Sequence, residues 1–339
     1  MKNLFKKVAC FTDIHFGMRN NSRLHNDDCE EFIKWFITEA QARDCETAIF
    51  LGDWHHHRAQ INVSTLNYTI SNLERLSNAF EKVYMIMGNH DLYYREKREI
   101  NSLPFGKVWK NIEIVNEIVQ DGDVAIVPWL VENEWKKVVK FKQPYMFGHL
   151  ELSGFKMNAM VEMPDHGGPG MGHFPNQEYV FTGHFHKRQN KSNVHYIGNA
   201  FPHNFADAWD DDRGMMILEW GGVPEYINWV DCPRYQTLDL STLMDNTDDI
   251  LKSKSHLKVN LDIDITYQEA NQIREIYLEK YPIRELTMIP NTNTDYTEDQ
   301  TTDGELEFET VDKVVLNQLQ CIKSETIKVD KLVSIYNSL

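Results

Sequence analysis

Five short apolar runs in the first two-thirds of the chain each lead directly into a polar motif that contains Asp, Asn or His. The motifs, in chain order, are Asp13-Ile14-His15, Gly52-Asp53, Gly88-Asn89-His90-Asp91, Gly148-His149 and Gly183-His184-Phe185-His186. In open α/β sheets, ligands bind at the carboxyl ends of the strands. If these runs are strands of shared sheets, all five motifs meet at one edge. This repeated placement constrains the fold more than any other feature of the sequence.

The spacing of apolar residues predicts the elements that carry the first three motifs. Residues 7–12, 47–51 and 82–87 are short apolar runs typical of buried strands. The segments between them place apolar residues at helical spacing, as in Phe32 and Phe36. Strands that alternate with helices require right-handed crossovers, which bury a largely parallel sheet.

From about residue 112 the chain changes to short strand-like runs with few helices between them. These runs lie at residues 112–115, 124–130, 144–149, 179–184, 194–199, 214–220 and 225–230. Turn-punctuated strands of this kind predict a second sheet that faces the first, or a mixed sheet. The predicted fold class is α/β, with two facing mixed β-sheets flanked by helices.

The chain beyond residue 234 differs from the body that precedes it. After a first domain at 1–234, residues 235–290 contain two strand-like segments around an amphipathic helix and predict a small α/β domain. Residues 291–310 hold seven acidic and no basic residues and predict a solvated linker. Residues 311–339 predict two short amphipathic helices. These helices either pack on each other or on the body, or they dock another chain, which is the interpretation that we favour.

Composition limits the environment and the partners of the chain. The 339 residues include 35 Lys and Arg against 51 Asp and Glu, a net charge of −16. Electrostatic nucleic-acid binders are normally basic, so cations must help this chain if it acts on phosphates. The five cysteines form no CxxC pair, which argues against a disulfide framework and for a reducing cytoplasm. We see no signal peptide and no apolar run of about 18 residues, so we expect a cytoplasmic protein without a membrane span.

The polar motifs combine ligand types that indicate a transition-metal site. Imidazole, carboxylate and amide groups without thiolate suit Mn, Fe or Zn better than Mg or Ca. The candidate ligands are Asp13, His15, Asp53, Asn89, His149, His184 and His186. Seven ligands are too many for one ion, whereas two ions about 3.5–4 Å apart account for them and suit phosphoester hydrolysis. A lone Gly-Asp is more often a turn and a lone Gly-His a chance pair, so the ordered set of five carries the prediction.

These motifs, in this order, resemble the calcineurin-type metallophosphoesterase superfamily. More narrowly, the chain resembles the SbcD-type nucleases, the catalytic subunits of the meiotic-recombination DNA double-strand-break repair complex. The features that narrow the resemblance are His56 three residues after Asp53, the run Gly183-His184-Phe185-His186-Lys187, and Tyr196-Ile197-Gly198-Asn199 followed by Phe205. On overall likeness, the chain looks most like the version encoded by large T-even-type phages. The likeness covers the body to about residue 232, and the later segments lie where the family has a DNA-capping domain and ATPase-docking helices.

The resemblance implies a role for each motif residue. Asp13, His15 and His186 would hold one metal, Asn89, His149 and His184 the other, and Asp53 would bridge the two. His90 would protonate the leaving oxygen or stabilise the transition state, and Asp91 would orient His90. His56 would support the site or contact the phosphate. We expect its neighbours His55 and His57 to be surface residues without a role.

The same resemblance implies a function. It predicts a nuclease with two divalent ions, Mn²⁺ first and Mg²⁺ as the alternative, which degrades duplex DNA ends 3′ to 5′ and cuts single strands. An SMC-like ATPase would bind at residues 311–339, and the nuclease would be a homodimer. The motifs alone also permit a stand-alone phosphodiesterase that acts on a small molecule. A non-catalytic scaffold with a decayed site is disfavoured, because every ligand type and His90 are present.

Overall fold

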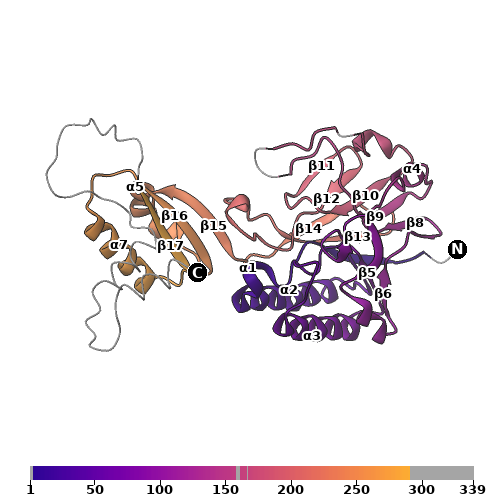
Figure 1. Ribbon diagram of the computed structural model, residues 1–339, viewed down its shortest axis with the longest axis horizontal. Coiled ribbons are helices and arrows are strands. Elements are labelled where there is room, and N and C mark those ends of the chain that lie inside the picture. Colours follow the sequence, from indigo (N-terminus) through magenta and orange to yellow (C-terminus); the bar gives the residue numbers. More distant parts are fainter. Residues whose placement is uncertain (1–2, 158–160, 166, 291–339) are drawn as a thin grey trace, which may run out of the picture.

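The computed structural model describes residues 3–157, 161–165 and 167–290. These form a large body of two β-sheets with helices and, at one end, a small unit that contains α7 and β15–β17 (Figure 1). The predicted linker at 291–310 and the predicted helix pair at 311–339 lie outside the described residues. The division of the chain into domains stays a prediction.

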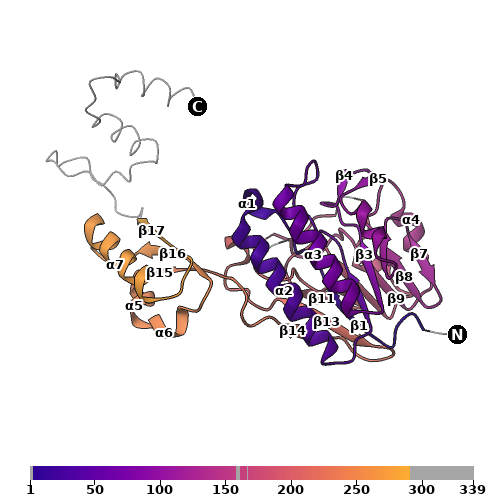
Figure 2. The ribbon, with the colours of Figure 1, turned by 90° about the horizontal axis from the view of Figure 1, so that it is seen from below.

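The first sheet has the strand order β14-β13-β1-β2-β3-β6. Its strands are β1 (Lys7–Phe11), β2 (Thr47–Phe50), β3 (Lys82–Ile86), β6 (Ile112–Val115), β13 (Gly214–Glu219) and β14 (Glu225–Asn228). The strands β1, β2, β3 and β6 are parallel, as the alternating pattern predicts, while β13 and β14 add antiparallel pairs at one edge. Helices α2 (Arg23–Gln41) and α3 (Val63–Ala79) cover one face of this sheet (Figure 2).

The second sheet has the order β11-β12-β10-β9-β8-β7 and faces the first. Its strands are β7 (Val119–Asp121), β8 (Val124–Val127), β9 (Tyr145–His149), β10 (Tyr179–Gly183), β11 (Gln189–Lys191) and β12 (Val194–Tyr196). The period of two along β1 explains the layers, since Phe11 packs under the helices whereas Val8 and Cys10 pack against Phe147 and Phe181 of the second sheet. The predicted fold class of two facing mixed sheets flanked by helices is confirmed.

Three of the seven strand-like runs after residue 112 belong to the first sheet, not the second. These runs became β6, β13 and β14. Alternation of apolar residues predicts that a strand is buried but not which neighbour it pairs with. The sheet to which each run belongs is therefore a property of the tertiary structure.

The small unit is a three-stranded parallel sheet with one main helix. It consists of β15 (Arg234–Asp239), α5 (Leu240–Asp245), α6 (Thr247–Ile250), β16 (Ser255–Leu261), α7 (Tyr267–Lys280) and β17 (Glu285–Pro290). Thr266 and Glu269 form a capping box at the start of α7. The unit is tied to α2 because the Arg284 guanidinium donates two hydrogen bonds of 2.7 Å to the buried Asp28 carboxylate.

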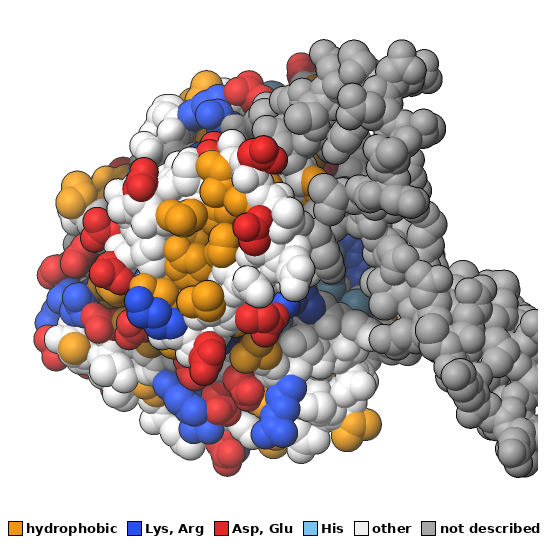
Figure 3. Space-filling view, turned by 90° about the vertical axis from the view of Figure 1, so that its left-hand side faces the viewer, with side chains coloured by type: hydrophobic (Ala, Val, Ile, Leu, Met, Phe, Trp, Pro, Cys, Tyr) orange, Lys and Arg blue, Asp and Glu red, His pale blue; other side chains and the backbone are white. Residues whose placement is uncertain are grey.

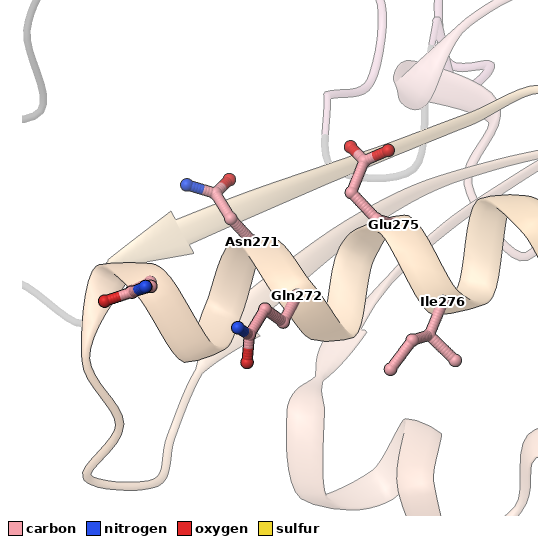
Figure 4. A pocket seen from close by; sticks show the side chains of 5 residues that line it. Asn271, Gln272, Glu275 and Ile276 are labelled. Carbon is pink, nitrogen blue, oxygen red and sulfur yellow. The ribbon is translucent and has the colours of Figure 1, made fainter.

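The outer surface of the small unit is partly apolar. Exposed Met244, Ile263 and Ile276 belong to it, and hydrophobic side chains gather on the face that Figure 3 shows. Along α7, Asn271 and Glu275 project on one side and Gln272 and Ile276 on another, in each case one turn apart (Figure 4). The α7 surface therefore mixes amide, carboxylate and apolar groups.

The remaining elements are short. They are α1 (Met18–Asn21), β4 (Leu92–Tyr94), β5 (Lys97–Asn101), η1 (Pro104–Val108), α4 (Trp135–Val138), η2 (Met171–His173) and η3 (Phe205–Asp207). Across the described ranges, no helix combines the length and the apolar character needed to cross a bilayer.

His195 links the two sheets, and its lowered pKa leads us to expect that the stability of the fold depends on pH. It lies on β12, its Nδ1 is 2.9 Å from the Tyr226 hydroxyl of β14, and burial lowers its pKa. The unfolded chain, with a histidine pKa of about 6.5, therefore binds more protons than the folded chain as the pH falls below that value. We expect the free energy of unfolding in urea to fall between pH 7.5 and pH 5.5. His195 accounts for at most about 1.4 kcal/mol of this fall, because pH 5.5 lies only about one unit below the pKa of an unfolded histidine.

In the variant His195→Gln, the free energy of unfolding should fall less over the same pH range, because the variant lacks one group that takes up a proton on unfolding. The matched control is His173→Gln, at an exposed position in η2. An equal pH dependence of His195→Gln and the wild-type chain would contradict this assignment.

Candidate metal centre

The five polar motifs meet because the carboxyl ends of five strands face one another. Asp13 and His15 follow β1, Asp53 follows β2, and Asn89 follows β3, all in the first sheet. In the second sheet, β9 ends at His149, and His184 and His186 follow β10. Since β1, β2 and β3 are mutually parallel and β9 is parallel to β10, each set of motifs shares one edge of its sheet. The facing arrangement of the sheets then brings the two edges together.

The predicted ligands form two groups of side chains. Asp13, His15 and His186 place ligand atoms within 4.8 Å of one another, and Asp53, His149 and His184 do the same. Asn89 belongs with the second group, because its Oδ1 lies 2.9 Å from His184 Nδ1 and 3.1 Å from His149 Nε2.

Asp53 lies between the two groups. Its Oδ2 is 3.8 Å from His15 Nε2 in the first group and 3.5 Å from His149 Nε2 in the second. A carboxylate in this position can offer an oxygen to each of two ions. The structure thus brings together all seven side chains predicted as ligands.

Two histidines of the second group are oriented as metal ligands usually are. The Nδ1–H of His149 donates to the Leu51 carbonyl oxygen at 2.7 Å, which leaves Nε2 directed at Asp53 and Asn89. His184 lies 3.1 Å from the Glu151 carboxylate through Nε2, which leaves Nδ1 beside Asn89. Histidine ligands normally donate their second N–H to a carbonyl or carboxylate in this way.

The first group contains a buried histidine whose ring nitrogens lack hydrogen-bond partners in the part of the chain that the structure describes, and a cation could bind there. His15 is buried, and within the described residues neither of its ring nitrogens has a hydrogen-bond partner. Buried polar atoms without a partner are rare in folded proteins. Burial, together with the neighbouring His90 and His186, holds the pKa of His15 well below its usual value, so its ring is neutral and can coordinate. The donor set therefore fits a pair of divalent cations.

The buried charges of Asp53 and His149 stabilise each other. Burial alone would raise the pKa of Asp53, but His149, together with His90 and His15, holds that pKa well below the usual value. Burial would likewise lower the pKa of His149, yet the Asp53 carboxylate raises it to about 9. Without a metal ion, the site thus keeps a proton on His149. A bound cation would displace that proton.

The backbone around the site is held in sparsely populated conformations. Asp13, His15, Asp53 and His184 all have positive φ angles, between 50° and 92°. Such conformations cost about 1–3 kcal/mol each and persist where surrounding packing enforces them. Gly88 meets a different constraint, because a Cβ there would lie 2.2 Å from Asp53 Oδ1. Gly88 therefore leaves room for the neighbouring ligand Asp53.

His90 and His56 lie side by side at the first ligand group. Their rings stack with centroids 5.4 Å apart, and the His90 ring meets the His15 ring edge to face at 4.9 Å. The Nδ1–H of His90 donates to the His56 carbonyl oxygen at 2.8 Å. The Nδ1 of His56 is buried without a hydrogen-bond partner in the described part of the chain. His90 Nε2, which the bond to the His56 carbonyl does not use, is therefore the nitrogen available to a bound phosphate.

Asp91 has a different role from the one predicted for it. It was expected to orient the His90 imidazole, but the His56 carbonyl holds that ring. The Asp91 carboxylate instead accepts backbone N–H bonds from four residues, which are Asp53, Trp54, His55 and Gly88. Burial and the Asp53 charge raise the pKa of Asp91 to about 7. Asp91 thus fixes the loop that presents Asp53.

The expectation for His55 is wrong. It was expected at the surface, but it is 1% exposed, and its ring nitrogens lie 2.8 Å from the hydroxyls of Ser102 and Thr69. His57, expected at the surface as well, is half-buried. A run of three histidines in a loop gives no periodicity from which their burial could be read.

Three supporting residues were missed by sequence reasoning. Glu151 contacts His184, His203 Nε2 donates to the Asp13 carbonyl at 2.8 Å, and His25 Nε2 donates to the His15 carbonyl at 3.0 Å. Glu151 had a usable signal, since it lies two residues beyond His149 at a strand end. His25 lies in α2, ten residues from His15, and His203 lies in a loop 190 residues from Asp13, and no sequence pattern marks either of them.

Comparisons with known proteins identify the class. A family model described as Calcineurin-like phosphoesterase matches residues 6–188, more than half of the chain. The chain therefore belongs to the calcineurin-like phosphoesterase family, which confirms the resemblance, and it is a metal-dependent phosphodiesterase or nuclease.

The individual proteins that the chain resembles share a quarter or less of their aligned residues with it. The chain is 25% identical over 223 residues to "Exonuclease subunit 1" of Enterobacteria phage T4, a match that covers 63% of this chain and 64% of that protein, less than two-thirds of its length. Among solved structures, it is similar to nuclease MPE of Pseudomonas putida, with 19% identity, a TM-score of 0.30, and coverage of 56% of this chain and 66% of that one. It is also similar to a dimetal phosphatase from Danio rerio, with 9% identity, a TM-score of 0.40, and coverage of 63% and 92%.

We expect Gly88→Ala to weaken metal binding, because the added Cβ would displace the Asp53 carboxylate. The expected loss of Mn²⁺ affinity is about tenfold to a hundredfold, the usual effect of disturbing a ligand's support. Isothermal titration calorimetry with Mn²⁺ measures it. The matched control is Gly172→Ala, where a Cβ would meet nothing within 4 Å. Equal Mn²⁺ affinities of the two variants would exclude this role of Gly88.

Proposed function

We propose that this protein is a Mn²⁺-dependent DNA nuclease, a duplex 3′–5′ exonuclease and single-strand endonuclease. The observation that carries the proposal is the position of Asp53 between two ligand groups, with His90 and His56 beside the first group. This arrangement suits cleavage of a phosphodiester, whose two non-bridging oxygens can each face one cation. The similarity to a phage exonuclease subunit supports DNA as the substrate.

The residues of the chain have separable tasks in this reaction. Two divalent ions held by Asp13, His15 and His186, and by Asn89, His149 and His184, with Asp53 shared, would supply an activated water and neutralise the charge of the phosphate. His56 would contact the phosphate. Asp91 holds the Asp53 loop through its backbone N–H groups, so the shared ligand keeps its place between the groups.

His90 would give a proton to the leaving oxygen. Its Nδ1–H is bound to the His56 carbonyl, so Nε2 carries a proton only when the ring is an imidazolium. The backbone N–H of His90 donates to Asp53 Oδ1 at 2.8 Å, which ties the acid to the shared ligand. The acid and the metal centre therefore keep a fixed relative position.

We further propose that the nuclease is the catalytic subunit of a complex for double-strand-break repair and recombination. An SMC-like ATPase would bind at residues 311–339, and two copies of the nuclease would form a homodimer. The T4 relative is described as a subunit, which supports a partner chain. The net charge of −16 also favours help from a partner in binding DNA.

We expect His90→Asn to abolish DNA cleavage while Mn²⁺ binding persists. Loss of a general acid costs about 10²–10⁴-fold in rate. The measurement uses end-labelled linear duplex DNA and a chromogenic phosphodiester with Mn²⁺, and calorimetry reports Mn²⁺ affinity. Asn78→Ala, at an exposed position of α3, is the control. Full duplex cleavage by His90→Asn would contradict the proposed role of His90. Hydrolysis of the ester with DNA left intact, even after the ATPase is added, would contradict the proposed nuclease function.

Removal of residues 311–339 should separate catalysis from assembly. We expect the shortened chain to hydrolyse the chromogenic ester as the full chain does, because every ligand lies before residue 187. Co-purification with the candidate ATPase should be lost. A shortened chain that still binds the ATPase would place the docking surface elsewhere.

A further inference from the structure

A cavity of about 240 Å³ lies directly against the second ligand group. Its described lining residues include His149, one of the predicted ligands, and Trp129, Trp135, Glu132, Glu151 and Pro169. None of the seven predicted ligands other than His149 is among them. The cavity is thus a compartment beside the metal centre, and the phosphate chemistry described above does not use it.

Trp129 forms a fixed aromatic wall between the cavity and the ligands. It follows β8, so it lies at the same edge of the second sheet as the polar motifs. Its ring centroid is 5.1 Å from that of His184 and 6.1 Å from that of His149. Its indole N–H donates to the Arg95 carbonyl at 3.1 Å, and the Arg95 guanidinium lies over the ring. These contacts hold the indole in one orientation.

Trp135 supplies a second indole from another element. It is half-buried at the start of α4, and its ring meets that of His173 edge to face at 5.7 Å. Two indoles on one small cavity are suited to a flat heteroaromatic ring, because aromatic side chains bind nucleobases by stacking.

The lining of the cavity is acidic, and the cations next to it are Arg95, 3.4 Å from the Glu151 carboxylate, and Lys136, over the Trp135 ring. The described lining contains the carboxylates of Glu132 and Glu151 and no Lys or Arg. Carboxylates repel phosphate oxygens but accept hydrogen bonds from the N–H groups of bases. The volume is also below the ~300–1,000 Å³ of pockets that enclose drug-sized ligands, so it suits one ring system and not a base pair.

We propose that this cavity, the Trp129–Trp135 pocket, binds the unpaired nucleobase of the terminal nucleotide that the nuclease releases. The proposal rests on the proposed nuclease function and adds a base-binding subsite to it. The base would stack on an indole while its phosphate lies at the metal centre. An end whose terminal base is missing should therefore be a poor substrate.

The first test compares two linear DNA duplexes in Mn²⁺, which differ only in whether the 3′-terminal nucleotide, placed opposite a non-complementary base, carries adenine or no base. We expect kcat/KM of the full chain to be about tenfold higher for the adenine end, the size of effect that stacking on one aromatic side chain gives. In Trp135→Ala this ratio should fall to about one. The control Trp209→Ala removes an exposed indole next to η3 and should keep the wild-type ratio.

The second test needs no variant and no DNA. Deoxyadenosine 5′-monophosphate and deoxyribose 5-phosphate compete with the chromogenic phosphodiester for the wild-type chain. Because only the nucleotide can fill the pocket, we expect it to inhibit about tenfold more strongly.

The outcomes separate the two proposals. DNA cleavage that is equally fast with and without the terminal base, or equal inhibition by the two monophosphates, overturns the pocket and leaves the nuclease function in place. Ester hydrolysis without DNA cleavage, with the ATPase present, overturns the nuclease function itself. A Trp209→Ala variant that loses the ratio as Trp135→Ala does would also overturn the pocket, because the effect would not be local.

Discussion

The buried Asp53 carboxylate is the constraint on which the rest of the site depends. It lies within 4 Å of a histidine from each ligand group, and it also accepts the backbone N–H of His90. Its negative charge is tolerated because His149 and the surrounding imidazoles offset the cost of burial. Its loop is in turn fixed by Asp91, a second buried carboxylate. The two carboxylates can lie this close because Asp91 accepts four backbone N–H bonds and because burial and the Asp53 charge raise the pKa of Asp91 to about 7.

The sandwich architecture makes this constraint possible. A single sheet would place at most the β1, β2 and β3 motifs together, and these lack His149, His184 and His186. The second sheet adds them because its own carboxyl edge faces the first. Apolar side chains between the sheets, among them Cys10, Phe147 and Phe181, hold the two edges in register. The packed core thus also supports the left-handed backbone conformations of Asp13, His15, Asp53 and His184.

The supporting hydrogen bonds connect distant parts of the chain to the ligands. Glu151 orients His184, the Leu51 carbonyl orients His149, and the His25 and His203 rings hold the carbonyls of His15 and Asp13. Trp129 contacts both ligand histidines of the second group and lines the neighbouring cavity. The same side chains therefore shape the metal centre and the space beside it.

The sequence by itself determined the ligand chemistry and the strands that present it. Residue type decides which atoms can bind a metal, and apolar periodicity over a few residues decides where strands such as 7–12 and 82–87 lie, so both are local properties. Only the tertiary structure decided that β6, β13 and β14 join the first sheet, that His55 is buried, and that Asp91 holds the Asp53 loop and not the His90 ring. Each of these depends on a contact between segments whose approach is set by the packing of the whole sandwich, and no short stretch of sequence encodes it.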